Sequence, residues 1–214
     1  MFESPVYRQL IAAVLLGGLP LSAAAESFDV GLGGRVIGQL ETGPGQLSSS
    51  LNNTPLGAAD GWFRATVSGG GYSALNSEGR AIAVRFSDGQ VQETTVTPES
   101  ERTDLSDPAA VPAGVLDPIT GLDRVVSATD CPAAFRMYDG RRAMLIQPTA
   151  REVDGSELVC RMSYTVTHGP GHVSPFRLKR LRMEARYALA DGQTAGINAL
   201  RISAGPFAVE LRRK

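Results

Sequence analysis

The chain has 214 residues, of which 43% are hydrophobic and 20% are charged, and its formal net charge is −1. Without its first 25 residues, which include Glu3 and Arg8, it keeps 20 basic (21 − 1) and 21 acidic (22 − 1) residues. This balance excludes a general electrostatic attraction to nucleic acid or to anionic lipid. The length is sufficient for one domain with a hydrophobic core.

Residues 1–25 have the pattern of a cleaved signal peptide. The apolar run over residues 10–21 is too short to span a bilayer as a helix, and small residues follow it. Ala23 and Ala25 form the A-x-A pattern of a signal peptidase site, so we expect cleavage between Ala25 and Glu26. An uncleaved membrane anchor is the alternative, because the leader carries little positive charge. Downstream, no apolar stretch has membrane length, so we expect no membrane span in the mature chain.

Alternating apolar residues at the start of the mature chain predict a β-hairpin. Phe28, Val30 and Leu32 alternate with other residues up to the Gly33-Gly34 pair, and the alternation resumes at Val36. A period of two with a glycine-rich turn is typical of antiparallel strands that bury one face.

Asp-Gly pairs predict further hairpins along the chain. Asp-Gly tolerates the positive φ values that two-residue hairpin turns require. Five such pairs are present, and four have strand-like flanks; the pairs begin at Asp60, Asp88, Asp139, Asp154 and Asp191. We therefore expect residues 26–214 to form a single, mainly β domain of antiparallel meander hairpins, curved into a sheet or half-barrel, with one or two short helices.

The segment from residue 97 to residue 120 is predicted to be a long loop. Four prolines lie there among acidic and small residues, a composition that does not favour a β ladder. A short helix is expected to follow, from Asp117 or Pro118 to Val126. Residues 53–63 are a candidate for a second short helix.

Residues 176–189 are compatible with either a strand or a helix. Leu181, Met183 and Ala185 alternate with charged residues, as a strand requires, but the composition also suits a helix. We favour a strand, because Asp191-Gly192 would close it into a hairpin with the apolar segment that follows.

The two cysteines, Cys131 and Cys160, are predicted to form a disulfide, because exported thiols pair in an oxidising compartment. If residues 134–138, 141–148 and 156–165 form a three-stranded meander, the outer strands lie about 9 to 10 Å apart. A disulfide needs Cα atoms within about 7 Å. Cys131 should therefore lie in the loop before its strand and fold over the sheet onto Cys160.

No catalytic or metal-binding constellation stands out. His168 and His172 occur in Thr-His-Gly-Pro-Gly-His, where the glycines and the proline preclude a helical i, i+4 metal pair, so a loop with incidental histidines is favoured. The paired carboxylates of the proline-rich loop, at positions 99 and 101 and at 104 and 107, are expected to be solvated. We therefore predict no catalytic residue, no metal and no cofactor.

Arginines are concentrated in two places. Arg141 and Arg142 follow the Asp139-Gly140 turn, and Arg182 and Arg186 lie on the predicted strand of residues 176–189. One interpretation makes these four residues the rim of a site for an anionic headgroup. The alternative is a solvated strand face balanced by acidic residues.

Several landmarks together resemble the exported bacterial proteins grouped as domain of unknown function 3108. They are the opening hairpin of residues 28–38, Leu116-Asp117-Pro118-Ile119-Thr120, Tyr138-Asp139-Gly140-Arg141-Arg142 and the two cysteines. The chain departs from the family in its glycine-rich stretch at residues 69–71 and its short C-terminus. The resemblance implies an envelope protein with a curved antiparallel sheet, similar to half-barrels that carry lipoproteins or lipids. Because that family has no established activity, the resemblance transfers no catalytic residue.

These observations predict an exported, periplasmic or secreted protein that binds an apolar or amphipathic envelope ligand, such as a lipid, without catalysis. The alternative is a structural or protein-interaction component of the cell envelope that binds another envelope protein. An envelope hydrolase is a third hypothesis. The ligand, the partner and the oligomeric state are left open by the sequence.

Overall fold

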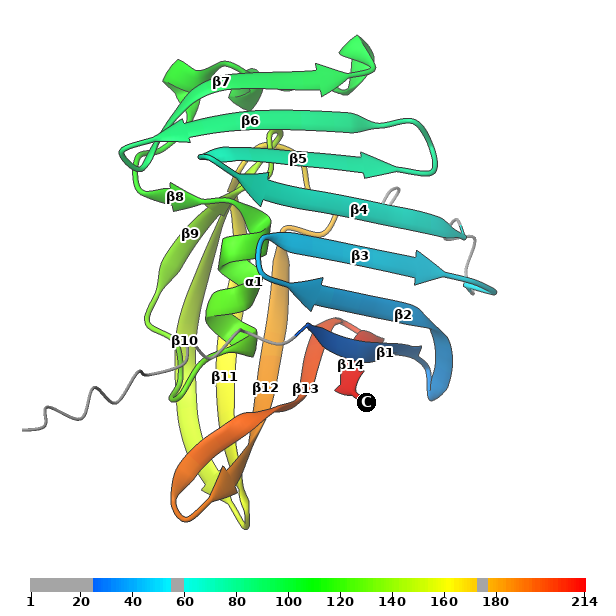
Figure 1. Ribbon diagram of the computed structural model, residues 1–214, viewed down its shortest axis with the longest axis vertical. Helices are drawn as coiled ribbons and strands as arrows, with labels where there is room; N and C mark the ends of the chain where they lie inside the picture. The colour runs from blue at the N-terminus through cyan, green and yellow to red at the C-terminus, as the bar shows by residue number, and fades with distance from the viewer. Residues whose placement is uncertain (1–24, 55–59, 173–176) are drawn as a thin grey trace, which may run out of the picture.

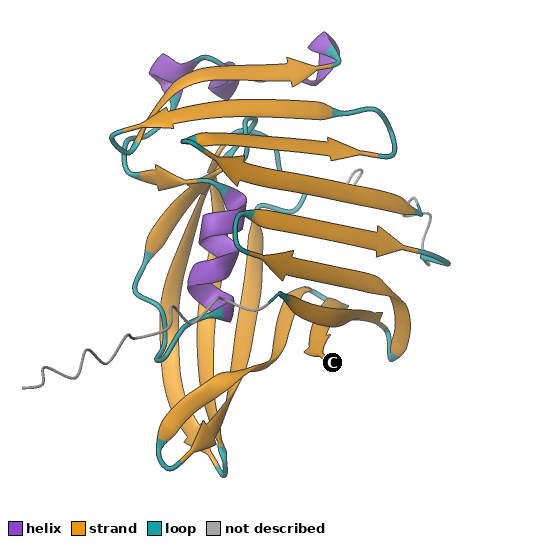
Figure 2. Cartoon of the chain, in the orientation of Figure 1, coloured by secondary structure: helices purple, strands orange, loops and turns teal. Residues whose placement is uncertain are grey.

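The structure is a computed structural model, and it describes residues 25–54, 60–172 and 177–214. In this part of the chain, fourteen strands form a single barrel-like sheet, and helices cover little of it (Figures 1 and 2). The predicted signal peptide of residues 1–25 lies, apart from Ala25, outside the described residues and remains a prediction.

The strands and helices have the following bounds. The first seven strands are β1 (Glu26–Leu32), β2 (Arg35–Gly43), β3 (Gln46–Leu51), β4 (Gly61–Ser68), β5 (Gly71–Asn76), β6 (Ala81–Ser87) and β7 (Gln90–Thr97). The other seven are β8 (Val115–Leu116), β9 (Phe135–Tyr138), β10 (Ala143–Asp154), β11 (Glu157–His168), β12 (Arg180–Ala190), β13 (Gln193–Ala204) and β14 (Phe207–Arg213). The helical segments are α1 (Pro118–Val126) and the single 3₁₀ turns η1 (Glu99–Glu101), η2 (Asp104–Ser106) and η3 (Pro108–Ala110).

The sheet consists of two meanders that meet in its middle. Strands β7 to β1 form one half and strands β14 to β8 form the other, and the first and last strands pair with each other. Val30 lies opposite Leu211 at this seam. All pairs are antiparallel except the two-residue pairing of β8 with β9. The prediction of a mainly β fold built as a curved antiparallel sheet is confirmed, and Figure 1 shows the strands of the two halves running in different directions.

Alternation along β12 shows how one face of the sheet is buried. Met183, Ala185 and Tyr187 are buried, while Arg182 is exposed and Arg186 lies half-buried among charged neighbours on the opposite face. The strand prediction for residues 176–189 is therefore confirmed over residues 180–189.

Four of the five Asp-Gly pairs lie at turns between strands. Asp88 and Asp191 have φ values of 52° in two-residue turns, and the glycine that follows each of them also has positive φ. Asp139 opens a turn of four residues between β9 and β10. Asp60 instead stands just before β4, where its carboxylate accepts a hydrogen bond from the backbone N–H of Thr54.

Two predictions need correction. The loop of residues 97–120 contains β8, because the apolar Val115 is buried and its short segment pairs in parallel with β9. The suggested helix over residues 53–63 is wrong at its end, because residues 61–63 begin β4 and pair with β3. Residues 55–59 lie outside the described part. The other helix prediction is confirmed: α1 starts at Pro118, and Asp117 caps it by accepting from the N–H groups of Ile119 and Thr120 at 2.9 Å.

Helix α1 lies in the angle between the two halves of the sheet (Figure 1). Near its N-terminus, Ile119 belongs to a cluster with buried residues of β4 to β7. At its C-terminus, Val125 and Val126 belong to a second cluster with residues of β1, β2 and β9 to β14. The helix therefore contributes to both hydrophobic clusters.

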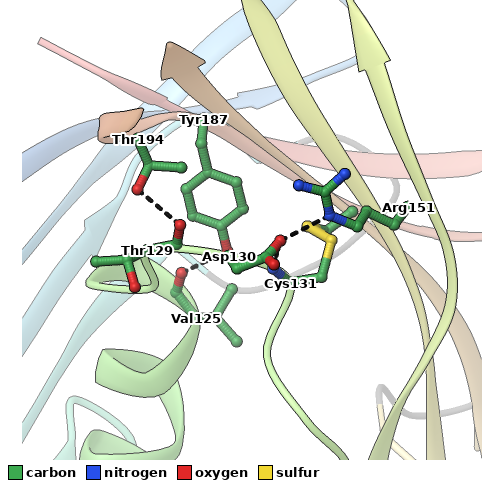
Figure 3. Close-up of a disulfide and its surroundings, with 8 residues drawn as sticks. Val125, Thr129, Asp130, Cys131, Arg151, Tyr187 and Thr194 are labelled. Carbon is green, nitrogen blue, oxygen red and sulfur yellow. Dashed lines mark hydrogen bonds and ion pairs between the residues drawn. A yellow bond between two sulfur atoms is a disulfide. The ribbon is translucent and has the colours of Figure 1, made fainter. Parts of the chain in front are cut away.

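The end of α1 and the segment after it are attached to the sheet at several points (Figure 3). Tyr187 donates a hydrogen bond to the Val125 carbonyl at 2.6 Å, and Thr194 donates to the Thr129 carbonyl at 2.9 Å. The predicted disulfide is confirmed: Cys131 lies in the loop before β9, Cys160 lies in β11, and their Cα atoms are 5.4 Å apart. These contacts hold the C-terminal end of α1 against the sheet.

Removal of the disulfide should destabilise the fold. The bridge closes a loop with a sequence separation of 29 residues, which corresponds to about 3 to 4 kcal/mol of unfolding free energy in the chain-entropy model. We expect the Cys131→Ala, Cys160→Ala double variant to lose about this amount in urea denaturation. Reductant should lower the unfolding midpoint of the wild type and leave that of the double variant unchanged. A wild type whose midpoint does not move when both thiols are shown to be free would contradict this.

Candidate functional site

A cleft of about 290 Å³ lies between the two halves of the sheet. Both halves contribute apolar side chains to its walls, and the start of α1 contributes Pro118. The apolar wall residues are Leu47, Phe63, Ala74 and Ile82 from β3 to β6, together with Met137 and Met144 from β9 and β10. Polar side chains also line the cleft, namely Tyr72, Asn76, Arg80, Asp139, Arg141, Arg142, Tyr164 and His172.

The turn between β9 and β10 places the arginines. The Asp139 carboxylate accepts hydrogen bonds from the backbone N–H groups of Arg141 and Arg142, both at 2.9 Å. Gly140 adopts a φ of 95°, and a Cβ there would lie 2.4 Å from Ile82 on the opposite half of the sheet. The Asp-Gly-Arg-Arg sequence thus forms a turn that is fixed by its own carboxylate and packed directly against β6.

Arg142, His172 and Tyr164 form a chain of hydrogen bonds beside this turn. The Arg142 Nη1 atom lies 2.7 Å from His172 Nδ1, and His172 Nε2 lies 2.6 Å from the Tyr164 hydroxyl oxygen. A guanidinium only donates, so Nδ1 must be the acceptor. In a neutral imidazole the proton then resides on Nε2, which donates to Tyr164.

Burial keeps His172 neutral. Desolvation, followed by the nearby charge of Arg142, lowers the pKa of His172 from 6.5 to about 4. Burial also raises the pKa of the Tyr164 and Tyr72 hydroxyls. At neutral pH this part of the cleft therefore contains a neutral imidazole and two protonated phenols.

Glu101 anchors the long loop to the same turn. Its carboxylate lies 2.6 Å from Arg141 Nη2 and 3.2 Å from Arg80 Nη2, and its backbone carbonyl accepts from Arg141 Nε at 2.6 Å. The hydrogen bond from Arg80 contributes most to lowering the pKa of Glu101. The expectation of solvated carboxylates in this loop is wrong for Glu101.

A buried tyrosine links the two edges of the sheet. Tyr138 of β9 donates its hydroxyl proton to the Leu105 carbonyl of the long loop, so Thr94 of β7 must be the donor in its 3.0 Å contact with the same oxygen. The backbone N–H of Gly114 also donates to the Gly89 carbonyl at 2.9 Å. These bonds hold the edge strand β7 close to β8 and β9, so the sheet is nearly closed at this end.

The four arginines predicted to share a rim do not lie together. Arg141 and Arg142 line the cleft, whereas Arg182 and Arg186 lie on the face of β12 opposite its buried residues. Arg186 pairs there with Glu157 and Glu184, at 3.1 Å and 2.9 Å. For Arg186, the structure agrees with the alternative interpretation, a strand face on which acidic residues balance the arginines.

His172 is one of the site residues that the sequence reasoning missed, together with Arg80 and Tyr164. His168 is exposed and ends β11, but His172 is turned into the cleft. The glycines around it carry a signal: a Cβ on Gly169 would lie 2.5 Å from the Arg141 carbonyl oxygen, and one on Gly171 would lie 2.1 Å from that of Arg177. Gly169 therefore permits close backbone approach to the turn of residues 139–142, which we call the arginine turn, and Gly171 permits close approach to the backbone of Arg177.

Residues 25–54, 60–172 and 177–214 contain neither a cluster of metal-ligand residues nor a helix that could span a membrane. Within these ranges, no three His, Cys, Asp or Glu residues are grouped as a metal site would require. No helix in the same ranges is both long and apolar enough to cross a bilayer.

These features define a mainly β protein with one nearly closed, barrel-like sheet and a polar and apolar cleft between its halves. No protein-family model and no curated protein matches the chain. Among solved structures, it is similar to a β-barrel-like protein of domain of unknown function DUF1849 from Brucella abortus, with 8% identity, a TM-score of 0.45, and coverage of 89% of this chain and 95% of that chain. A DNA polymerase sliding clamp from Pseudomonas aeruginosa aligns with 10% identity and a TM-score of 0.13 over 92% of this chain and 58% of that chain. Both TM-scores are too low to support an argument about function.

Acid should destabilise the protein through His172. The unfolded chain protonates this histidine below its ordinary pKa of 6.5, whereas the folded protein does so only near 4. The stability that depends on neutral His172 is complete above pH 6.5 and is lost progressively as the pH falls to 4. Between pH 7 and 4.5, the wild type should lose on the order of 2 kcal/mol more unfolding free energy than His172→Gln.

Glutamine is a suitable replacement because it accepts from Arg142 and donates to Tyr164 without titrating. His168→Gln, at the exposed histidine, is the matched control and should follow the wild type. Denaturant curves at each pH measure the difference. Equal acid sensitivity of His172→Gln and the wild type would show that His172 is not held neutral.

Proposed function

We propose that the protein is a non-catalytic binding protein for a small amphipathic ligand of the cell envelope, which it holds in the cleft between the two halves of the sheet. The observation that carries this proposal is the cleft itself, with apolar walls from strands β3 to β6 and from β9 and β10 and with polar groups gathered around the turn of residues 139–142. Ligand sites in proteins are commonly concave and mostly apolar, with a few placed polar groups.

The size of the cleft limits the ligand. A volume of 290 Å³ corresponds to about ten water molecules at liquid density and lies near the lower end of the range for small-molecule sites, about 300–1,000 Å³. A short alkyl chain with one polar headgroup therefore suits the cleft better than a whole diacyl lipid.

Export is part of the proposal. The Cys131–Cys160 disulfide supports it, because such bonds persist in oxidising compartments. The leader of residues 1–25 and the resemblance to domain of unknown function 3108 point to the same location. We also propose that the chain belongs to that family, which the curved antiparallel sheet supports.

A substitution that fills the cleft tests the proposal. Ala74 faces the cleft from β5, and Ala74→Leu adds three carbon atoms to the space that the ligand would occupy. We expect calorimetry to show that decanol, a neutral amphiphile, binds to the wild type and binds at least ten-fold more weakly to this variant. Ala83→Leu is the matched control, because Ala83 of β6 is exposed, and its affinity should equal that of the wild type. Equal loss of decanol binding in both variants, or no binding to the wild type of decanol or of acidic amphiphiles with the same chain length, would refute the proposal.

A second candidate is a protein-interaction component of the envelope, favoured by a groove of about 620 Å³ between the β1–β2 and β13–β14 turns. Val36 is 66% exposed and Phe207 is 36% exposed there. Exposed apolar side chains beside a groove are typical of contact sites. If this groove binds a partner, Val36→Asp should remove a crosslinked product seen with the wild type in envelope preparations, whereas Ala83→Asp should leave it in place.

A further inference from the structure

The charges around the polar end of the cleft do not balance. Three guanidinium groups, from Arg80, Arg141 and Arg142, face two carboxylates, and Glu101 already holds both Arg80 and Arg141. Asp139 is shared between Arg142 and two backbone N–H groups. His172 is neutral and cannot supply charge of either sign at neutral pH.

Asp117 does not restore the balance. This buried carboxylate caps α1 and accepts hydrogen bonds from the N–H groups of Ile119 and Thr120 and from the Thr120 hydroxyl, at 2.6 to 2.9 Å. Its charge is therefore committed to the start of the helix. One positive charge at the arginine turn remains without a dedicated counterion among the residues that the structure describes.

The excess charge belongs to the cluster as a whole, because Arg80 and Arg141 share Glu101, whereas Arg142, which is only 9% exposed, lies beside Asp139. The Arg142 Nη1 atom contacts His172, and its Nε lies 3.1 Å from Asp139 Oδ2 but makes no hydrogen bond. Within residues 25–54, 60–172 and 177–214, this Nε is one of the buried side-chain atoms that have no hydrogen-bond partner. A buried cation with an unfilled donor is costly unless something else satisfies it, and Arg142 lines the cleft.

Tyr164 places a second donor at the same end of the cleft. Its hydroxyl oxygen accepts from His172 Nε2, so its own proton is available to donate. The imidazole holds both groups, with Arg142 on one ring nitrogen and Tyr164 on the other. The Arg142 guanidinium and the Tyr164 hydroxyl are thus fixed on either side of the His172 ring. This pair of donors suits an acidic group that has two acceptor oxygens and one negative charge.

We infer that the polar end of the cleft binds the acidic headgroup of an amphiphile, a carboxylate or a phosphate, with Arg142 as its charge partner and the Tyr164 hydroxyl as a second donor. The alkyl part lies along the apolar walls, next to Leu47, Phe63 and Met144. This inference rests on the proposed function and adds the sign of the ligand's charge and the residue that recognises it.

Calorimetry with four probes tests the inference on the full-length protein. Decanoate and decyl phosphate carry the two candidate headgroups, decanol carries none, and inorganic phosphate lacks the chain. Both acids should bind at least ten-fold more tightly than decanol and than inorganic phosphate. Equal binding of inorganic phosphate and decyl phosphate would overturn the inference, because the site would then bind the free anion.

Variants at Arg142 assign the effect to that residue. Arg142→Gln keeps a donor for His172 but removes the charge, and it should weaken binding of both acids by ten- to hundred-fold while decanol binding changes less than two-fold. Arg142→Lys should recover most of the acid affinity. Arg182→Gln, which removes a charge from the exposed face of β12, is the matched control and should bind like the wild type.

The outcomes separate the inference from the proposed function. Decanol binding that is sensitive to Ala74→Leu but shows no preference for acids would overturn the inference alone. Unchanged acid binding in Arg142→Gln would also overturn it. If Arg142→Gln does not fold, the ranking of the four probes on the wild type and on Arg142→Lys still decides the question. If none of the probes binds to the wild type, the proposed function and the inference both fail.

Discussion

Contact of helix α1 with both halves of the sheet is the constraint on which the rest of the structure depends. A curved sheet with one apolar face must cover that face, and α1 is the one helix of more than a single turn within the described residues. Ile119 packs with the β4 to β7 cluster, and Val125 and Val126 pack with the other. The Cys131–Cys160 bridge and the bond from Tyr187 to the Val125 carbonyl then hold the end of the helix on the second half. The relative position of the two halves follows from this contact.

The cleft exists because one helix is too short to cover the whole concave face. A nine-residue helix spans about 14 Å. Beyond its first residue, Pro118, side chains of a turn and a loop join the facing strands in place of the helix. The 139–142 turn packs against Ile82 there, and the long loop reaches the same turn through Glu101. The two edges of the sheet are joined by polar groups around Tyr138. The cleft therefore has apolar walls, which come from the two facing halves of the sheet, and a charged end, where the 139–142 turn and the long loop join them.

Local features of the fold could be predicted from the sequence, and long-range ones could not. Alternation and Asp-Gly pairs indicate strands and turns because both act within a few residues, and the pairing of two cysteines has one solution. The pairing of β1 with β14 joins the two ends of the chain, and nothing local encodes it. Glu101 appears solvated in a proline-rich loop until the fold brings Arg80 and Arg141 to it. The neighbours of His172 preclude a helix and so argue against a metal pair, yet the same glycines allow the backbone approach that places His172 beside Arg142.

The charge at the arginine turn has a cost that packing alone does not explain. Substitution of a buried ion pair by apolar residues is often neutral or stabilising. Folding stability alone therefore does not favour a cluster of three arginines and two carboxylates over apolar residues at this position. The long loop could be held by Glu101 and Arg141 alone, since Arg141 makes contacts with both the carboxylate and the backbone carbonyl of Glu101. Arg142 adds a contact to His172 and leaves its Nε without a hydrogen bond. Its position is understandable if an acidic group from outside the chain completes the cluster, because the ligand would then supply the missing counterion and the desolvated arginine would favour an anion over a neutral amphiphile of the same length.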